Sequence, residues 1–148
     1  MITEDSVAID APPRLVWEVF SDVERWPEWT ASVTSLTGLD GPGLAVGKRF
    51  AIKQPRMSKL VWQVTEIDPG TSWTWVQRAP GATASARHDV IAQPGGGTLV
   101  RQRIDQNGVF GALVGRLMGS MTKRYLKLEA QGLKARSEQL SRADGAHS

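Results

Sequence analysis

The stretch APPRLVWEVFSDVERWPEW, residues 11–29, decides the fold class because it combines a helix start, an apolar helical face and a helix stop. Pro13 suits a first helical turn, where its missing N–H removes no hydrogen bond. Apolar residues follow at helical spacing, namely Leu15, Val16, Val19 and Phe20. We therefore predict one helix from about Pro13 to Asp22 and a second, short helix near Val23–Trp26, which Pro27 ends.

Seven segments with strand character flank these helices, one before them and six after them. They are Ser6–Ile9, Ser32–Leu39, Arg49–Gln54, Leu60–Ile67, Ser72–Gln77, Ala84–Ala92 and Thr98–Asp105. Most are separated by short turn signals, such as the Pro-Gly pairs that begin at Pro69, Pro80 and Pro94. Because such short connections cannot cross over a sheet, the strands should form an antiparallel meander with both helices on one side.

From Val109 to about Leu140 the pattern becomes that of one long helix. Its apolar residues are spaced by three or four and should be buried against the sheet: Phe110, Leu113, Val114, Leu117, Met121, Tyr125 and Leu128. Gly111, Gly115 and Gly119 share one face, which leaves two explanations open, close approach of a strand or room beside a ligand. We expect residues 141–148 to be a disordered tail after a single domain, residues 1–140.

Composition excludes several classes of protein. The chain has 148 residues, a net charge of +3, 41% hydrophobic residues and no Cys, which is typical of one globular domain and excludes thiol chemistry and Cys-ligated metals. The N-terminus lacks a signal-peptide pattern, and the apolar run at residues 109–121 is interrupted by Arg116 and too short to span a bilayer. We therefore expect a cytoplasmic protein without stable membrane insertion, as a monomer or homodimer.

The positive charge is concentrated in the C-terminal segment. Residues 109–148 hold seven Lys or Arg and three Asp or Glu, whereas residues 1–108 hold 11 and 12. A solvated helix face explains this pattern, and a surface for an acidic protein or a membrane is the alternative. We expect no nucleic-acid binding, because the aromatic residues of this helix are predicted to point to the core and leave no stacking platform.

Three stretches resemble the START-like (SRPBCC) superfamily in its polyketide cyclase/dehydrase branch. They are the stretch at residues 11–29, VTEIDPGTSWTW at residues 64–75 and GGGTLVRQRIDQNG at residues 95–108. The resemblance implies an α+β helix-grip fold, a curved seven-stranded antiparallel sheet wrapped around a long C-terminal helix, with two short helices between the first and second strands. It also implies a hydrophobic cavity between sheet and helix. Members differ in activity, from lipid carriage to polyketide cyclisation, so the fold does not fix the function.

Strand alternation predicts which side chains face that cavity. The more apolar parity selects Phe50, Ile52, Leu60, Trp62, Val64, Trp73, Trp75, Ala86, His88, Val90, Ala92, Val100, Gln102 and Ile104. The opposite parity contains Arg87, Asp89, Arg101 and Arg103, which suit cross-strand ion pairing in water. An apolar lining with a few polar groups is typical of a small-molecule site.

The predicted ligand-binding set combines these strand positions with the helix. It consists of Phe50, Trp62, Trp75, His88, Gln102, Leu113, Leu117 and Met121. His88 is the candidate catalytic residue, since imidazole titrates near neutrality, and the alternative is a neutral buried histidine bonded to Gln102 or backbone. A lone histidine without convergent ligands predicts no metal and no cofactor.

Two functions remain open from the sequence. The first is binding or transport of a small hydrophobic, lipid-like or polyketide-like, ligand in the cavity. The alternative is an aromatase/cyclase-type enzyme that cyclises or dehydrates a polyketide, with His88 moving a proton.

Overall fold

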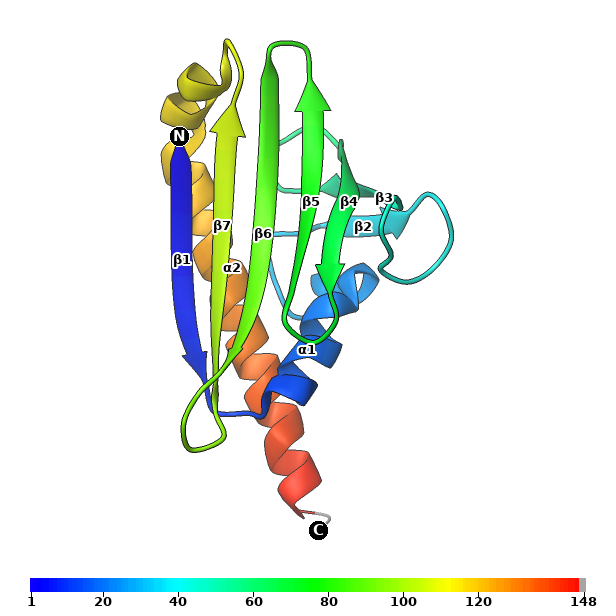
Figure 1. The fold of residues 1–148 in the computed structure, drawn as a ribbon, viewed down its shortest axis with the longest axis vertical. Helices are drawn as coiled ribbons and strands as arrows, with labels where there is room; N and C mark the ends of the chain where they lie inside the picture. The colour runs from blue at the N-terminus through cyan, green and yellow to red at the C-terminus, as the bar shows by residue number, and fades with distance from the viewer. Residues whose placement is uncertain (147–148) are drawn as a thin grey trace.

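The computed structural model describes residues 1–146, in which a seven-stranded antiparallel sheet curves around one long helix (Figure 1). The strands are β1 (Ile2–Ile9), β2 (Ser35–Gly38), β3 (Arg49–Lys53), β4 (Leu60–Asp68), β5 (Ser72–Ala79), β6 (Ala82–Ala92) and β7 (Thr98–Asn107). Their order in the sheet is β1-β7-β6-β5-β4-β3-β2, so the first strand pairs with the last and the others form the predicted meander. The helix-grip fold is confirmed.

Two helical segments connect β1 to β2, as predicted. The α-helix α1 (Pro13–Ser21) starts with Pro13 in its first turn and buries Leu15, Val16 and Phe20. The next segment, η1 (Val23–Glu28), is a 3₁₀ helix that extends two residues past the predicted end and includes Pro27. The Trp26 indole Nε1 donates a hydrogen bond to the Phe20 carbonyl oxygen at 2.9 Å, which fixes η1 against the end of α1.

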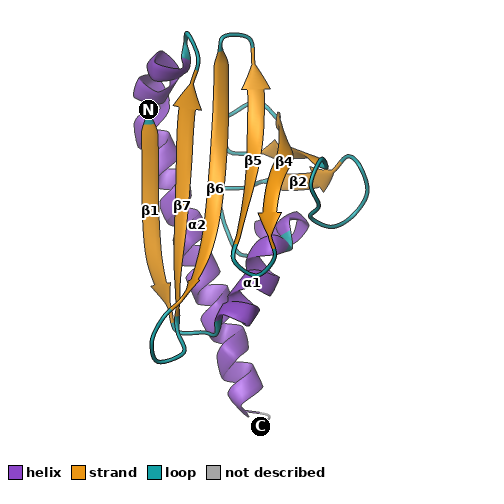
Figure 2. Cartoon of the chain, in the orientation of Figure 1, coloured by secondary structure: helices purple, strands orange, loops and turns teal. Residues whose placement is uncertain are grey.

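The long helix α2 (Gly111–Ala146) packs on the same face of the sheet as α1 (Figure 2). It continues six residues beyond the predicted end near Leu140, so the expectation of a disordered tail is wrong for residues 141–146. One more helical turn and a half forms because nothing at residues 141–144, SRAD, breaks a helix. His147 and Ser148 lie outside the described residues.

The first half of α2 meets the sheet through its glycines and not through its apolar stripe. A Cβ added to Gly115 would lie 2.8 Å from Gln106 Oε1 and 2.9 Å from Met1 Sδ, and one on Gly111 would lie 3.1 Å from the Gln106 carbonyl carbon. The close-approach explanation therefore holds for Gly111 and Gly115 but not for Gly119, whose Cβ would meet only Met1 Cε at 3.5 Å. The predicted burial of the stripe is wrong for its first half, since Phe110, Leu113 and Leu117 are exposed. Farther along, the buried face of α2 is formed by Tyr125, Leu126, Ala130 and Leu133.

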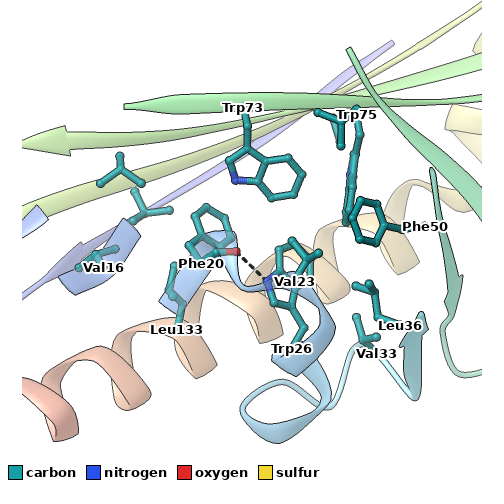
Figure 3. Close-up of a cluster of buried hydrophobic side chains, with 14 of the residues drawn as sticks. Val16, Phe20, Val23, Trp26, Val33, Leu36, Phe50, Trp73, Trp75 and Leu133 are labelled. Atoms are coloured by element: carbon teal, nitrogen blue, oxygen red, sulfur yellow. Dashed lines mark hydrogen bonds between the residues drawn. The ribbon is translucent and has the colours of Figure 1, made fainter. Parts of the chain in front are cut away.

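The core lies at the end of the sheet where α1, η1 and the second half of α2 meet (Figure 3). Its largest buried side chains are Trp26, Trp73, Phe20, Phe50 and Leu133. Phe20 and Trp26 stack with ring centroids 5.6 Å apart, and Trp73 and Trp75 meet edge to face at 4.5 Å. This aromatic cluster fills one end of the space inside the curved sheet and leaves the other end to a cavity.

Candidate functional site

A cavity of about 490 Å³ lies between the inner face of the sheet and the first half of α2. Its sheet wall is hollow because β6 places three alanines, Ala82, Ala84 and Ala86, at alternate inward positions. The opposite wall comes from α2, and Trp26, Trp62 and Trp75 lie toward the core. The α2 residues of this wall are Val114, Leu117, Met118, Met121, Thr122, Tyr125, Leu126 and Glu129.

Six of the eight predicted ligand-binding residues line this cavity. They are Trp62, Trp75, His88, Gln102, Leu117 and Met121. Phe50 does not line it, because its ring is fully buried in the core against Trp75, with centroids 6.0 Å apart. Leu113 is 54% exposed and points away from the cavity. The periodicity predicts that the apolar stripe of α2 packs against the sheet, but the glycine face of the helix lies there instead.

The strand parity is otherwise correct, with two exceptions. Ala92 was expected to face inward but is exposed at the end of β6, beyond the cover of the helices. Asp89 faces outward as expected, yet it is buried, because Arg87 Nε and Arg101 Nε lie 3.0 and 3.6 Å from its two carboxylate oxygens. The pair of Asp89 with Arg101 of β7 is the cross-strand pairing that the sequence indicates, whereas Arg87 lies on β6 with Asp89.

His88 is buried among aromatic rings at the inner end of the cavity. Its ring stacks on Trp73, with centroids 3.7 Å apart and planes 9° apart, and Phe20 approaches its edge at 5.3 Å. Its Nδ1 lies 3.2 Å from the Trp73 carbonyl oxygen, which can only accept, so Nδ1 carries the hydrogen of the neutral ring. Burial lowers the pKa of His88 to about 3, so the imidazole is neutral at physiological pH and a weak base.

Gln102 is an unpaired polar side chain of the cavity wall, where the Oε1 of Gln106 also has no hydrogen-bond partner. Gln102 lies opposite His88 in the register of β6 and β7, and only 2% of it is exposed. Neither its Oε1 nor its Nε2 has a hydrogen-bond partner within residues 1–146. Because buried amides are nearly always paired, and leaving one unpaired costs about 1–3 kcal/mol, this side chain is the strongest indication of a ligand contact.

Glu129 is a cavity residue that the sequence analysis missed. It is 7% exposed, and the Ser32 hydroxyl, itself paired with Thr30 Oγ1 at 2.8 Å, donates to its Oε1 at 3.3 Å. Burial raises the pKa of Glu129 to about 8, so its carboxyl is protonated at neutral pH and can donate as well as accept. The signal was present in its spacing, four residues after Tyr125 and four before Leu133 on the buried face.

Within residues 1–146, no three His, Cys, Asp or Glu side chains gather as metal ligands. No helix in that range is long and apolar enough to cross a membrane.

Comparison with known proteins identifies the family. Residues 2–138 match the family model described as polyketide cyclase/dehydrase and lipid transport. The chain belongs to this family. The chain is similar to a putative polyketide cyclase from Streptomyces halstedii, with 30% identity over 83 residues, which are 56% of this chain and 65% of that protein.

Solved structures share the helix-grip fold at low sequence identity. The Zhui aromatase/cyclase from a Streptomyces species superposes with a TM-score of 0.80 at 16% identity, over 98% of both chains. A START superfamily protein from Mycobacterium smegmatis gives 0.69 at 18% identity, over 94% of this chain and 98% of that one. These likenesses confirm the START-like fold, and the function has to come from the cavity itself.

Proposed function

We propose that this family member binds a small, uncharged hydrophobic molecule in the cavity, with Gln102 orienting a hydroxyl or carbonyl group of the ligand. The observation that carries the proposal is the unpaired Gln102 amide, which is buried in an otherwise largely apolar wall. A ligand oxygen would satisfy the amide, while the apolar body of the ligand would cover Trp62, Trp75 and Met121.

The ionisable groups of the cavity favour an uncharged ligand. His88 is neutral and Glu129 is protonated near pH 7, so neither can neutralise a carboxylate. Arg87 and Arg103 lie on strands that line the cavity, but their side chains are exposed on the outer face of the sheet. Arg87 also forms an ion pair with Asp89. An anion would therefore lose its hydration without gaining an ion pair, which is costly in an apolar site.

Three matched probes test this proposal by isothermal titration calorimetry: naphthalene, 2-naphthol and 2-naphthoate. We expect naphthalene and 2-naphthol to bind, and 2-naphthoate to bind at least about tenfold more weakly, equivalent to about 1.4 kcal/mol. Gln102→Leu should weaken 2-naphthol binding and leave naphthalene binding nearly unchanged. The control, Gln131→Leu, alters an exposed glutamine of α2 outside the cavity. Absence of binding by all three probes would refute the proposal.

A second function, cyclisation of a polyketide-like chain, is favoured by the position of Glu129. A buried carboxyl whose pKa is about 8 can give a proton to a carbonyl oxygen at neutral pH, whereas His88, with its pKa lowered to about 3, is too weak a base to take a proton from carbon. In an aldol closure, an α-carbon would lose a proton to water and bond to a second carbonyl carbon, whose oxygen would take the proton of Glu129. The new hydroxyl and a second α-proton then leave as water.

The enzymatic alternative is tested with a linear 1,5-diketone, whose cyclisation to a cyclohexenone is followed by ultraviolet absorbance. Catalysis predicts an acceleration over buffer that Glu129→Gln reduces by about a hundredfold, within the range of general acid catalysis. A rate equal to that of buffer for both proteins would leave binding as the function.

A further inference from the structure

The start of α2 and the two residues before it expose a row of large apolar side chains, here named the apolar ridge. Its members are Val109, Phe110, Leu113, Val114 and Leu117, where Val109 is 86% and Leu117 72% exposed. Single exposed apolar residues are common on protein surfaces, but five within nine residues form a continuous patch, which indicates an interaction surface.

Four exposed cations, here named the basic flank, lie beside this ridge. They are Arg116, Lys123, Arg124 and Lys127. None of them has an ion-pair partner within residues 1–146, and no Asp or Glu occurs between Val109 and Leu128. At 100° per residue, the basic flank projects on one side of the ridge and the cavity-lining residues on the other.

The ridge also borders the opening of the cavity. Val114 and Leu117 belong to both, since they line the cavity and are exposed. Across the opening, the β3–β4 loop, residues 54–59, contributes Gln54 and Met57 to the lining, and the Tyr125 hydroxyl donates a hydrogen bond to the Pro55 carbonyl oxygen. Arg56 and Lys59 in this loop are exposed as well, so cations stand on both sides of the opening.

We propose that the apolar ridge and the basic flank dock on an anionic lipid bilayer, with the opening of the cavity turned toward the lipid. The exposed cations would be attracted to an anionic surface, and removing the ridge side chains from water would also favour docking. Transfer of a ligand between the cavity and the bilayer during docking rests on the proposed function. The docking itself does not depend on the proposed function. A second copy of this chain fits the surface poorly, because pairing two copies would bring their cations together without any acidic residue on the patch.

Vesicle co-sedimentation tests the docking with the full chain. We expect binding to vesicles of phosphatidylcholine with about 30% phosphatidylglycerol, and at least about tenfold weaker binding to phosphatidylcholine alone or at high salt. The double variant Val109→Ser/Leu113→Ser should weaken binding about tenfold, and so should Lys123→Gln/Lys127→Gln. The matched control, Val46→Ser/Val61→Ser, removes two exposed valines from other parts of the surface, which are 62% and 45% exposed.

Two outcomes would overturn the docking proposal. One is equal binding of the wild type and the ridge variant to anionic vesicles. The other is a dimer in analytical ultracentrifugation that the ridge variant abolishes, because the occupant would then be a second copy. Calorimetry with 2-naphthol separates this proposal from the proposed function: Val109 and Leu113 do not line the cavity, so their variant should keep its 2-naphthol affinity. Loss of 2-naphthol binding by the wild type with vesicle binding intact would refute the proposed function alone.

Discussion

His88 and Glu129, two ionisable side chains of one cavity, are both held neutral by burial. Burial shifts their pKa values in opposite directions. Burial penalises charge, so it lowers the pKa of His88 from 6.5 to about 3 and raises the pKa of Glu129 from 4.5 to about 8. The Trp73 carbonyl opposes the first shift and the Ser32 hydroxyl opposes the second, yet burial dominates both. The cavity therefore carries hydrogen-bonding capacity without charge across the physiological range.

These shifts predict how the free energy of unfolding depends on pH. Because the folded-state pKa of Glu129 is raised, its contribution to stability is complete below about pH 4.5 and is lost as pH rises toward 8. Because the pKa of His88 is lowered, its contribution is present above 6.5 and is lost as pH falls toward 3. The two slopes cancel between 4.5 and 6.5. Between pH 6.5 and 8, where Glu129 acts alone of the two, stability should fall by about 2 kcal/mol.

Urea denaturation at a series of pH values measures this loss. Glu129→Gln should remove the fall between pH 6.5 and 8, since the amide does not ionise. The control Glu4→Gln changes an exposed carboxyl of β1 and should keep the wild-type slope. If Glu129→Gln kept that slope as well, the titrating group would have to lie elsewhere.

At the scale of the element, the glycines of α2 differ in what they permit. A Cβ on Gly119 would meet only Met1 Cε at 3.5 Å, an ordinary contact, whereas a Cβ on Gly132 would lie 2.0 Å from the Trp29 carbonyl oxygen. Gly119→Ala should therefore stabilise the protein by up to about 1 kcal/mol through helix propensity. Gly132→Ala should destabilise it by about 2 kcal/mol or more, because backbone has to move.

Thermal unfolding of the two variants tests this contrast, and each serves as the control for the other. Both substitutions add one methyl group within the same helix, so a general effect of alanine would shift both melting temperatures in the same direction. Equal shifts would contradict the close approach of Trp29 to α2.

The same helix shows how far the sequence could predict the molecule. The number and order of the strands were predicted correctly because two-residue alternation and Pro-Gly turns are local signals, although β1 begins at Ile2 and not at Ser6, and β2 is shorter than predicted. The orientation of the first half of α2 was not predicted, because the contact of Gly115 with Met1 joins residues more than a hundred positions apart. Glu129 was missed because a charged residue on a helix normally indicates solvent, although its spacing from Tyr125 and Leu133 places it on the buried face.

At the scale of the whole molecule, the interior is divided between a packed half and a hollow half. Aromatic residues from α1, η1 and β5 fill the first half (Figure 3). The hollow half begins where the inward-facing residues of β6 change from Val90 and His88 to three alanines. A sheet selected only for stability would fill this space, because burying apolar side chains is stabilising. Keeping small residues there is consistent with selection for a ligand.

Filling the cavity should therefore separate stability from binding. Ala84→Leu places a larger side chain at the middle of the alanine row, and we expect it to weaken 2-naphthol binding by about tenfold or more, because the probe and the new side chain compete for one space. The free energy of unfolding should stay equal or rise by up to about 2 kcal/mol. Ala8→Leu, on the outer face of β1, is the control and should leave the 2-naphthol affinity unchanged. A variant that bound 2-naphthol as well as the wild type but unfolded more easily would mean that the probe binds outside this cavity, and that the space beside Ala84 is too small for a leucine.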